Sequence, residues 1–276
     1  MKNKELFTLN PELVNLKNEG VAKIRTINET EDLAVVEYEL KTFVCEGEYH
    51  DGLKKILEFY LQHFDTTEQP AFWVSGFYGS GKSHLVKMAS YLWDDFWFPS
   101  GNSARIIKPL PQDIRDLFVE LGRKQKINGT LSIAGTLRDF PSKDIRYSFL
   151  QLMLSALGLP QQYHHFKFVY WLKNEGIYDG VKALIESAGK ELKKEVENLF
   201  VSSALAKAVL EMKPDLAENE MKLRDLFKAQ FTKIETINRQ DFVHTIKDEI
   251  LPLSFGNKIP CTIIVLDEVQ QFIGQD

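Results

Sequence analysis

Eight consecutive residues in the first third of the chain have the types and spacing that bind phosphate groups. Residues 76–83 read Gly-Phe-Tyr-Gly-Ser-Gly-Lys-Ser and fit the pattern G-x-x-x-x-G-K-[ST] at every constrained position. Glycines let the backbone wrap closely around phosphates, so that successive N–H groups point inward. Lys82 would place a cation against the β and γ phosphates, and the Ser83 hydroxyl would bind Mg²⁺. The predicted nucleotide-binding residues are Gly76, Phe77, Tyr78, Gly79, Ser80, Gly81, Lys82, Ser83 and His84.

Both the loop and its neighbouring histidine have an alternative interpretation. A glycine-rich turn can match the pattern by chance, but an apolar segment precedes this loop and a helical pattern follows it, which favours a nucleotide site. His84 lies on the first helical turn after the loop, where it would be near a bound nucleotide. A histidine that packs on a helix face is the commoner case.

A second group with catalytic potential lies near the end of the sequence. Asp267 and Glu268 directly follow the apolar run 261–266. After a buried strand, the aspartate would hold Mg²⁺ through water and the glutamate would act as the general base for the attacking water. The alternative is a pair of acids that begins a surface helix, where negative charge suits the helix dipole. The phosphate loop upstream favours catalysis: the predicted catalytic residues are Glu268 and Lys82, and the predicted metal ligands are Ser83 and Asp267.

The adjacent acids also indicate which nucleotide and which class of enzyme to expect. An aspartate followed by a glutamate is typical of the additional-strand, catalytic-glutamate ATPases, which include the AAA+ motors. The guanine-specificity pattern N-K-x-D is absent from the sequence. We therefore predict ATP and Mg²⁺ as the cofactors.

Apolar periodicity predicts the elements around these motifs. The predicted helices next to the loop cover residues 49–65 and 82–94. Short runs rich in branched and aromatic residues predict strands over 71–75, 104–110, 129–137 and 261–266, the first of them buried on both faces. Two earlier runs, 20–24 and 33–40, also favour β structure. From 142 to 251 the pattern is helical, and Ser, Asp or Asn lies near several of the expected helix starts.

These elements predict an α/β fold, that of a P-loop NTPase of the additional-strand, AAA+-like type with an incomplete parallel sheet. The predicted domains are a small mixed N-terminal cap with its leading helix (1–66), the first part of the NTPase core (67–141), a large all-helical insertion (142–252) and the strand with the two acids (253–276). The chain between the two motifs is much longer than one or two βα units, so the helical block must be an insertion. The central strand that follows the acids in this class is missing from the sequence. We expect the front part of a longer protein, or a truncated product.

The composition is that of an ordinary globular protein. Of the 276 residues, 44% are hydrophobic and 26% charged, and the net charge of −5 gives no global attraction to nucleic acid, so that DNA binding would need a local basic patch. No apolar run approaches the roughly 20 residues of a membrane span. The two cysteines, Cys45 and Cys261, have no metal-ligand or redox spacing. We expect a cytoplasmic protein with reduced thiols and no membrane association.

Three segments together resemble a known family. The segments that carry the resemblance are residues 53–64, 72–93 and 261–274. The sequence resembles the large bacterial P-loop ATPases of the BrxC/PglY type, from BREX phage-exclusion systems, or a close sister family. The resemblance implies an ATPase that couples its nucleotide state to conformational change in a DNA-associated defence complex. Its implied partners are the other subunits of that complex, with self-association through the ATP site. The arginine finger and sensor residues have no matching positions here. Because the central strand is also missing, we expect at best weak ATP binding and negligible turnover from this chain alone.

Two other functions fit the same motifs. The first alternative is a nucleotide-dependent scaffold, in which ATP binding orders the helical block for a partner and turnover is incidental. The second is a small-molecule kinase, which is disfavoured because the region after the loop has no evident acceptor site or basic lid. A Glu268→Gln variant separates the ATPase from the scaffold.

Overall fold

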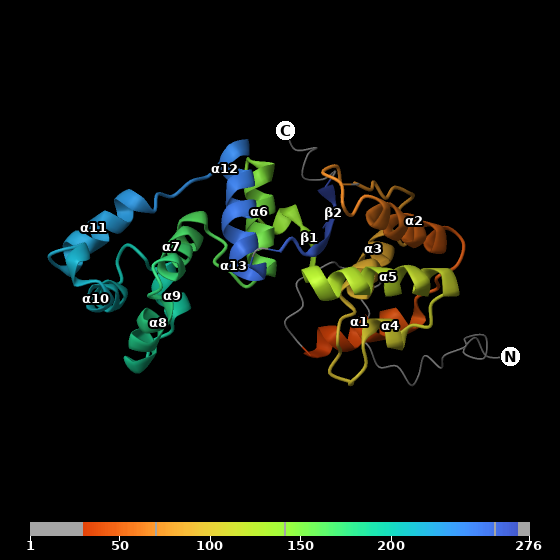
Figure 1. The fold of residues 1–276 in the computed structure, drawn as a ribbon, viewed down its shortest axis with the longest axis horizontal. Helices are drawn as coiled ribbons and strands as arrows, with labels where there is room; N and C mark the ends of the chain where they lie inside the picture. The colour runs from red at the N-terminus through yellow and green to blue at the C-terminus, as the bar shows by residue number, and fades with distance from the viewer. Residues whose placement is uncertain (1–29, 70, 141, 257, 270–276) are drawn as a thin grey trace. The chain divides into compact units, whose positions relative to one another are not determined.

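The computed structural model describes residues 30–69, 71–140, 142–256 and 258–269. The chain forms two compact units, which we describe separately (Figure 1). The first unit comprises Met1–Gly135 and Pro260–Asp267, and the second comprises Thr136–Ile259 and Glu268–Asp276. None of the helices in the described ranges combines the length and the apolar character needed to cross a bilayer.

The first unit is helical around a small parallel sheet. Its elements are α1 (Thr30–Thr42), α2 (Glu48–Gln62), α3 (Lys82–Asp94), α4 (Ala104–Ile107), α5 (Gln112–Asn128), β1 (Thr130–Thr136) and β2 (Cys261–Asp267). The strands β1 and β2 are neighbours in the sheet. More than a hundred residues separate them in the sequence, because the chain of the helical unit is inserted between them. The sheet is parallel, so both strands end at the same edge.

A single core joins α3 to the sheet and to the helices around it. Trp93, near the end of α3, is 2% exposed, and its indole Nε1 donates to the carbonyl of Cys261 at 3.1 Å. The Tyr60 ring of α2 meets the Trp93 ring edge-on at 4.6 Å. A buried indole needs a hydrogen-bond partner, and here the partner is the first residue of β2. The contact therefore places the end of α3 against the start of β2.

Arg105 satisfies the carbonyl end of α3. Its Nε donates to the Leu92 carbonyl at 2.7 Å and its Nη2 to the Trp93 carbonyl at 2.8 Å. The guanidinium also lies 4.6 Å from the centroid of the Phe118 ring of α5. The last carbonyls of a helix have no partner within the helix, and a cation there is favoured by the helix dipole. One side chain thus fixes α3 against α5.

The second unit is all-helical in its described part. Its elements are η3 (Leu137–Asp139), α6 (Ile145–Ala156), α7 (Tyr163–Asn174), α8 (Tyr178–Ser187), α9 (Leu192–Glu197), α10 (Ser203–Met212), η4 (Pro214–Leu216), α11 (Glu220–Gln230), α12 (Arg239–His244), the π-helix η5 (Thr245–Ile250) and α13 (Leu251–Phe255). An aromatic cluster of Phe168, Trp171, Phe227 and Phe231 joins α7 to α11 in its core. Side chains of Asp144, Ser202, Asn219 and Asn238 accept backbone N–H groups at helix starts, as the sequence predicted.

Several predicted elements are confirmed. The helix after the loop has the predicted bounds, 82–94, and the predicted strands 129–137 and 261–266 correspond to β1 and β2. The predicted helix over 49–65 is α2. The mainly helical character predicted for 142–251 is also confirmed.

The predicted strand over 71–75 is wrong. These residues form no strand in the described structure, and Phe72 and Trp73 are 42% and 75% exposed. A strand requires a neighbour for its N–H and C=O groups. Within the described residues β1 and β2 pair with each other, and neither pairs with this segment.

Two further strand predictions are wrong. Residues 33–40 lie in α1, where Val36 and Leu40 are buried and Leu33 packs against the same core. Their spacing of three and four is that of a helix face, and this period prevails over the β propensity of the valines. Of residues 104–110, the first four form α4 instead of a strand. The remaining predicted run, 20–24, lies outside the described residues.

Candidate nucleotide-binding site

Glycines shape the loop that leads into α3. Gly79 and Gly81 have φ angles of 78° and 79°, a left-handed conformation that side chains with a Cβ rarely adopt. A Cβ on Gly76 would lie 2.9 Å from the Ser80 Oγ, which is too close. Gly79 and Gly81 are therefore required by the backbone path of this loop, and Gly76 leaves room for the Ser80 side chain. The variable positions between them are open, because Phe77 and Tyr78 are 90% and 97% exposed.

The lysine of the motif folds over the loop. The Lys82 Nζ donates to the Gly76 carbonyl at 2.9 Å and to the Phe77 carbonyl at 2.7 Å. An ammonium group has three donors and is a compact point charge. Lys82 therefore places its charge at the mouth of the loop, where a phosphate group would be attracted to it.

The start of α3 supplies free backbone donors. The Leu85 N–H donates to the Gly81 carbonyl at 2.9 Å, which is the first turn of the helix. The N–H groups of Lys82, Ser83 and His84 precede it, and such groups have no acceptor within a helix. Together with the helix dipole, they favour an anion at this position. The loop therefore fits the phosphate groups of a nucleotide.

The His84 side chain packs away from the helix start. Its ring contacts the ring of Phe43 edge-on, with 5.6 Å between centroids, and Phe43 is 2% exposed. Burial lowers the pKa of the His84 imidazole, so the ring is neutral near pH 7. A role for His84 in nucleotide binding would thus come from its backbone N–H. The assignment of this residue to the nucleotide site stays a prediction.

The two acids follow β2. Asp267 is the last residue of the strand, and Glu268 comes next with a φ of 54°, which is uncommon for a residue with a side chain. The Glu268 carboxylate pairs with the Arg138 guanidinium at 3.3 Å, and Arg138 lies in η3, directly after β1. Parallel strands end at one edge of a sheet, and this brings the two side chains together.

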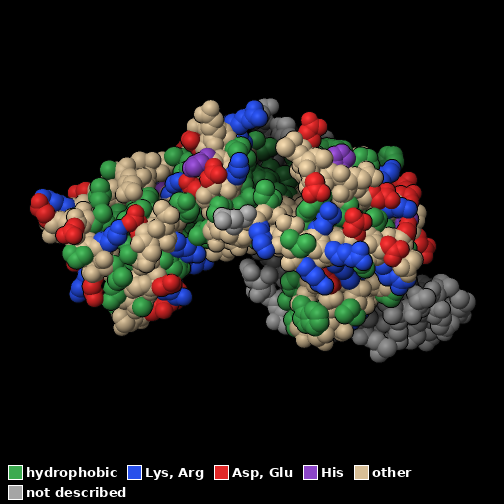
Figure 2. All heavy atoms as spheres, in the orientation of Figure 1, with side chains coloured by type: hydrophobic (Ala, Val, Ile, Leu, Met, Phe, Trp, Pro, Cys, Tyr) green, Lys and Arg blue, Asp and Glu red, His purple; other side chains and the backbone are tan. Residues whose placement is uncertain are grey.

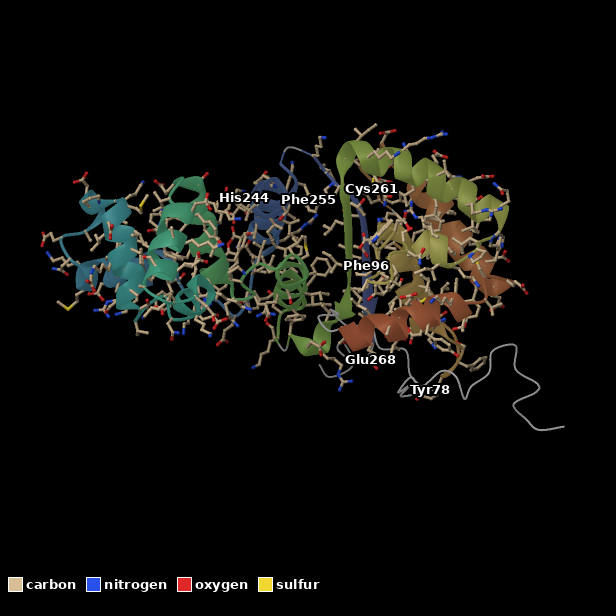
Figure 3. All side chains as sticks on the ribbon, turned by 90° about the horizontal axis from the view of Figure 1, so that it is seen from below. Tyr78, Phe96, His244, Phe255, Cys261 and Glu268 are labelled. Atoms are coloured by element: carbon tan, nitrogen blue, oxygen red, sulfur yellow. The ribbon has the colours of Figure 1, made fainter. Side chains whose placement is uncertain are left out.

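The loop lies toward the edge of the sheet where β2 ends. The helix α3 packs along β2, and its carboxyl end is joined to Cys261 at the start of the strand. A helix that runs opposite to a strand has its amino end near the carboxyl end of that strand. Figure 3 shows Cys261 at one end of β2 and Tyr78 of the loop toward the other. A magnesium bridge from Ser83 to Asp267 requires this arrangement, and the bridge itself stays a prediction.

The comparison with protein families agrees with this geometry. A model of the KAP family P-loop domain matches residues 53–269, most of the chain. This chain belongs to the KAP family. No curated protein and no solved structure matches it.

Membership in the KAP family supports one part of the resemblance drawn from the motifs, the P-loop NTPase domain. The match confirms a P-loop NTPase domain and implies nucleotide binding, typically with Mg²⁺. It is a match to the KAP family and not to the BREX ATPases, and it gives no support to a role in phage defence.

Tyr49, four residues before the start of the matched range, is a contact of the phosphate loop that the sequence patterns missed. Its hydroxyl donates to the Ser80 carbonyl at 2.9 Å. Tyr49 lies in the first turn of α2 and Ser80 in the loop before α3, so the two residues are far apart in the sequence. The predicted helix over 49–65 placed Tyr49 only at a helix start. No spacing rule connects a residue there with the phosphate loop.

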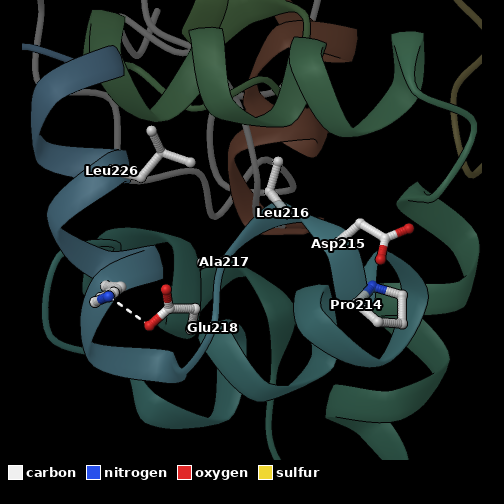
Figure 4. A pocket seen from close by; sticks show the side chains of 7 residues that line it. Pro214, Asp215, Leu216, Ala217, Glu218 and Leu226 are labelled. Atoms are coloured by element: carbon white, nitrogen blue, oxygen red, sulfur yellow. Dashed lines mark hydrogen bonds and ion pairs between the residues drawn. The ribbon is translucent and has the colours of Figure 1, made fainter.

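Two hollows lie in the second unit. The larger one, of about 510 Å³, is in the second unit beside η4 and α11 (Figure 4). Leu216 and Leu226 line it, and Lys222 pairs with Glu218 at its edge. Within the described ranges, no group of His, Cys, Asp or Glu is arranged to hold a metal ion. We assign this hollow no ligand.

Proposed function

We propose that this KAP domain is an ATPase of the additional-strand, catalytic-glutamate type, which binds ATP with Mg²⁺ and couples its hydrolysis to conformational change. The observation that carries the proposal is the loop of residues 76–83, with its left-handed glycines, the folded lysine and the start of α3 directly behind it. The pair Asp267-Glu268 at the end of β2 supports hydrolysis rather than binding alone.

In this proposal each polar residue has a separate role. The loop N–H groups and Lys82 hold the phosphates, and Ser83 and Asp267 hold Mg²⁺, which neutralises phosphate charge when bound. Glu268 would take a proton from the attacking water. The oxygen of that water bonds to the γ-phosphorus, and the bond between the γ-phosphorus and the bridging oxygen of the β-phosphate breaks. Glu268 must then exchange its ion pair with Arg138 for a contact with that water.

Two substitutions test binding and hydrolysis separately. For Lys82→Ala we expect loss of ATP binding with an unchanged melting temperature, because the side chain is only partly buried and its ammonium bonds to loop carbonyls. Calorimetric titration and thermal unfolding measure the two quantities. The exposed, ion-paired Lys228 gives a matched control, Lys228→Ala. Unchanged ATP affinity in Lys82→Ala would contradict the assignment of the loop.

For Glu268→Gln, compared with wild type in the complete natural protein, we expect retained ATP binding and a loss of turnover by a factor of about 10² or more. The carboxamide keeps the size of the side chain but is a poor base. Phosphate release under saturating ATP measures the effect. Equal turnover in wild type and variant would favour the scaffold, in which binding alone orders a partner.

The biological setting is a separate part of the proposal. The motif resemblance supports a cytoplasmic role in phage defence, with other subunits of a defence complex, a second copy at the ATP site or DNA as partners. The visible faces of both units carry Lys and Arg interspersed with Asp and Glu (Figure 2), a surface that suits protein partners better than a general grip on DNA. Plating efficiency of phage on cells with wild-type or Lys82→Ala protein tests this setting, and equal plating would contradict it.

A further inference from the structure

The first turn of α2 reaches the phosphate loop through one side chain. Tyr49 is the second residue of α2, and its hydroxyl donates to the Ser80 carbonyl at 2.9 Å. The Tyr49 ring is placed by an edge contact with Phe43, with 5.9 Å between centroids. Because Phe43 is 2% exposed, the tyrosine is positioned by the core of the first unit. The loop is thus tied to the folded body of the unit at Ser80.

The hydrogen bond at Ser80 also orients the next N–H group. The Ser80–Gly81 peptide is trans, and in a trans peptide the carbonyl and the following N–H point in opposite directions. The carbonyl of Ser80 is directed at Tyr49 on α2. The N–H of Gly81 is therefore directed away from α2. This N–H is the one immediately before the free donors at the start of α3.

Gly81 and Tyr49 are also matched in shape. A Cβ on Gly81 would lie 1.8 Å from the Tyr49 hydroxyl and 3.0 Å from its Cζ. The tyrosine therefore occupies the space that the missing side chain leaves open. The glycine is required twice here, by its φ of 79° and by this close approach.

Tyr49 and Lys82 hold different parts of the loop. Lys82 takes the carbonyls of Gly76 and Phe77, and Tyr49 takes that of Ser80. A phosphate group competes for the ammonium of Lys82, because that group is its natural counter-charge. The Tyr49 hydroxyl carries no full charge, so a phosphate group attracts it less strongly than it attracts the ammonium. Its bond to Ser80 can persist when a phosphate enters the loop.

We propose that Tyr49 is a positioning residue of the phosphate site, which holds the Ser80–Gly81 peptide so that the Gly81 N–H is directed at a bound polyphosphate. This inference rests on the proposed nucleotide binding and adds to it a residue outside the motif. The ligand group affected is the phosphate chain and not the base, because the Gly81 N–H would bond to a phosphate oxygen.

The test is a Tyr49→Phe variant, which removes one oxygen and keeps the ring. We expect the affinities for Mg·ATP and for inorganic tripolyphosphate to fall by the same factor, roughly two- to ten-fold, as for the loss of one hydrogen bond. The melting temperature should remain within the range of a Tyr170→Phe control, whose ring lies in the second unit. An equal loss for both ligands at an unchanged melting temperature is a result that a general loss of stability would not produce.

Amide hydrogen exchange without ligand gives a second measurement. Residues 77–83 should exchange faster in Tyr49→Phe than in wild type, because the loop loses its tie to α2. Equal affinities and equal exchange rates in wild type and variant would overturn the role of Tyr49, while ATP binding by wild type would leave the proposed function intact. If wild type bound neither ATP nor tripolyphosphate, both proposals would fail.

Discussion

His50 lies between two carboxylates on the surface of the first unit. Its Nδ1 is 3.0 Å from the Asp51 carboxylate, and its Nε2 is 3.0 Å from that of Asp113 on α5. Lys54 also pairs with Asp113 at 3.0 Å. The hydrogen bonds to Asp51 and Asp113 raise the pKa of His50, and those from His50 and Lys54 lower the pKa of Asp113 to about 2. These side chains join α2 to α5 next to Tyr49.

This cluster predicts a pH dependence of stability. A group whose pKa is raised by folding contributes its full stabilisation below its unfolded pKa, here about 6.5, and loses it as the pH rises through the folded value. We therefore expect wild type to exceed His50→Gln in melting temperature by more at about pH 6 than at about pH 9. A Lys54→Gln control should show a difference that is nearly constant over this window, because the lysine remains charged throughout. A constant difference for His50→Gln would contradict the prediction.

At the scale of the element, α3 is held at both ends by side chains from other helices. Tyr49 contacts the loop before it, and Arg105 and the Trp93–Cys261 hydrogen bond fix its carboxyl end. The helix is also amphipathic, with Leu85, Met88 and Leu92 buried at helical spacing. The position of the phosphate loop therefore depends on packing along the whole of α3.

Arg105→Ala should destabilise the first unit by about 2–4 kcal/mol, since it removes charge-assisted bonds to two helix carbonyls and the stem that packs on Phe118. Chemical denaturation, with the midpoint and slope compared to wild type, measures the change. Arg115→Ala is a matched control, because Arg115 is an exposed residue of α5 that bonds to Gln112 on the same helix. A difference below about 0.5 kcal/mol between the two variants would contradict the role given to Arg105.

At the scale of the whole molecule, each unit has its own core, and the motif residues of the phosphate loop belong to the first. Phe227→Ala removes a ring that is 1% exposed and contacts Phe168, Trp171 and Phe231 in the second unit. We expect a loss of about 3–5 kcal/mol in the stability of that unit, with unchanged ATP affinity at temperatures where it remains folded. Calorimetric unfolding and ATP titration of the same sample measure both. A parallel loss of affinity would contradict the independence of the two cores.

The short-range features were determined by the sequence alone. The pattern of residues 76–83 identified the phosphate loop, and the apolar face behind it gave the bounds of α3. The run before Asp267 identified β2, and the helical periodicity of the inserted block is confirmed in the second unit. Local periodicity and turn chemistry are properties of neighbouring residues, so that one sequence suffices to read them.

The features that depend on partners distant in the chain were decided only by the tertiary structure. The apolar run 71–75 looks like a buried strand, but pairing makes a strand, and neither β1 nor β2 pairs with it. The valines of α1 have a high β propensity, but this segment is a helix because its apolar residues pack against the core at helical spacing. Likewise, the contacts of Tyr49 with Ser80 and of Arg138 with Glu268 join residues with no relation in sequence. Such contacts exist only after the backbone has brought its distant segments together, which is why no local pattern predicts them.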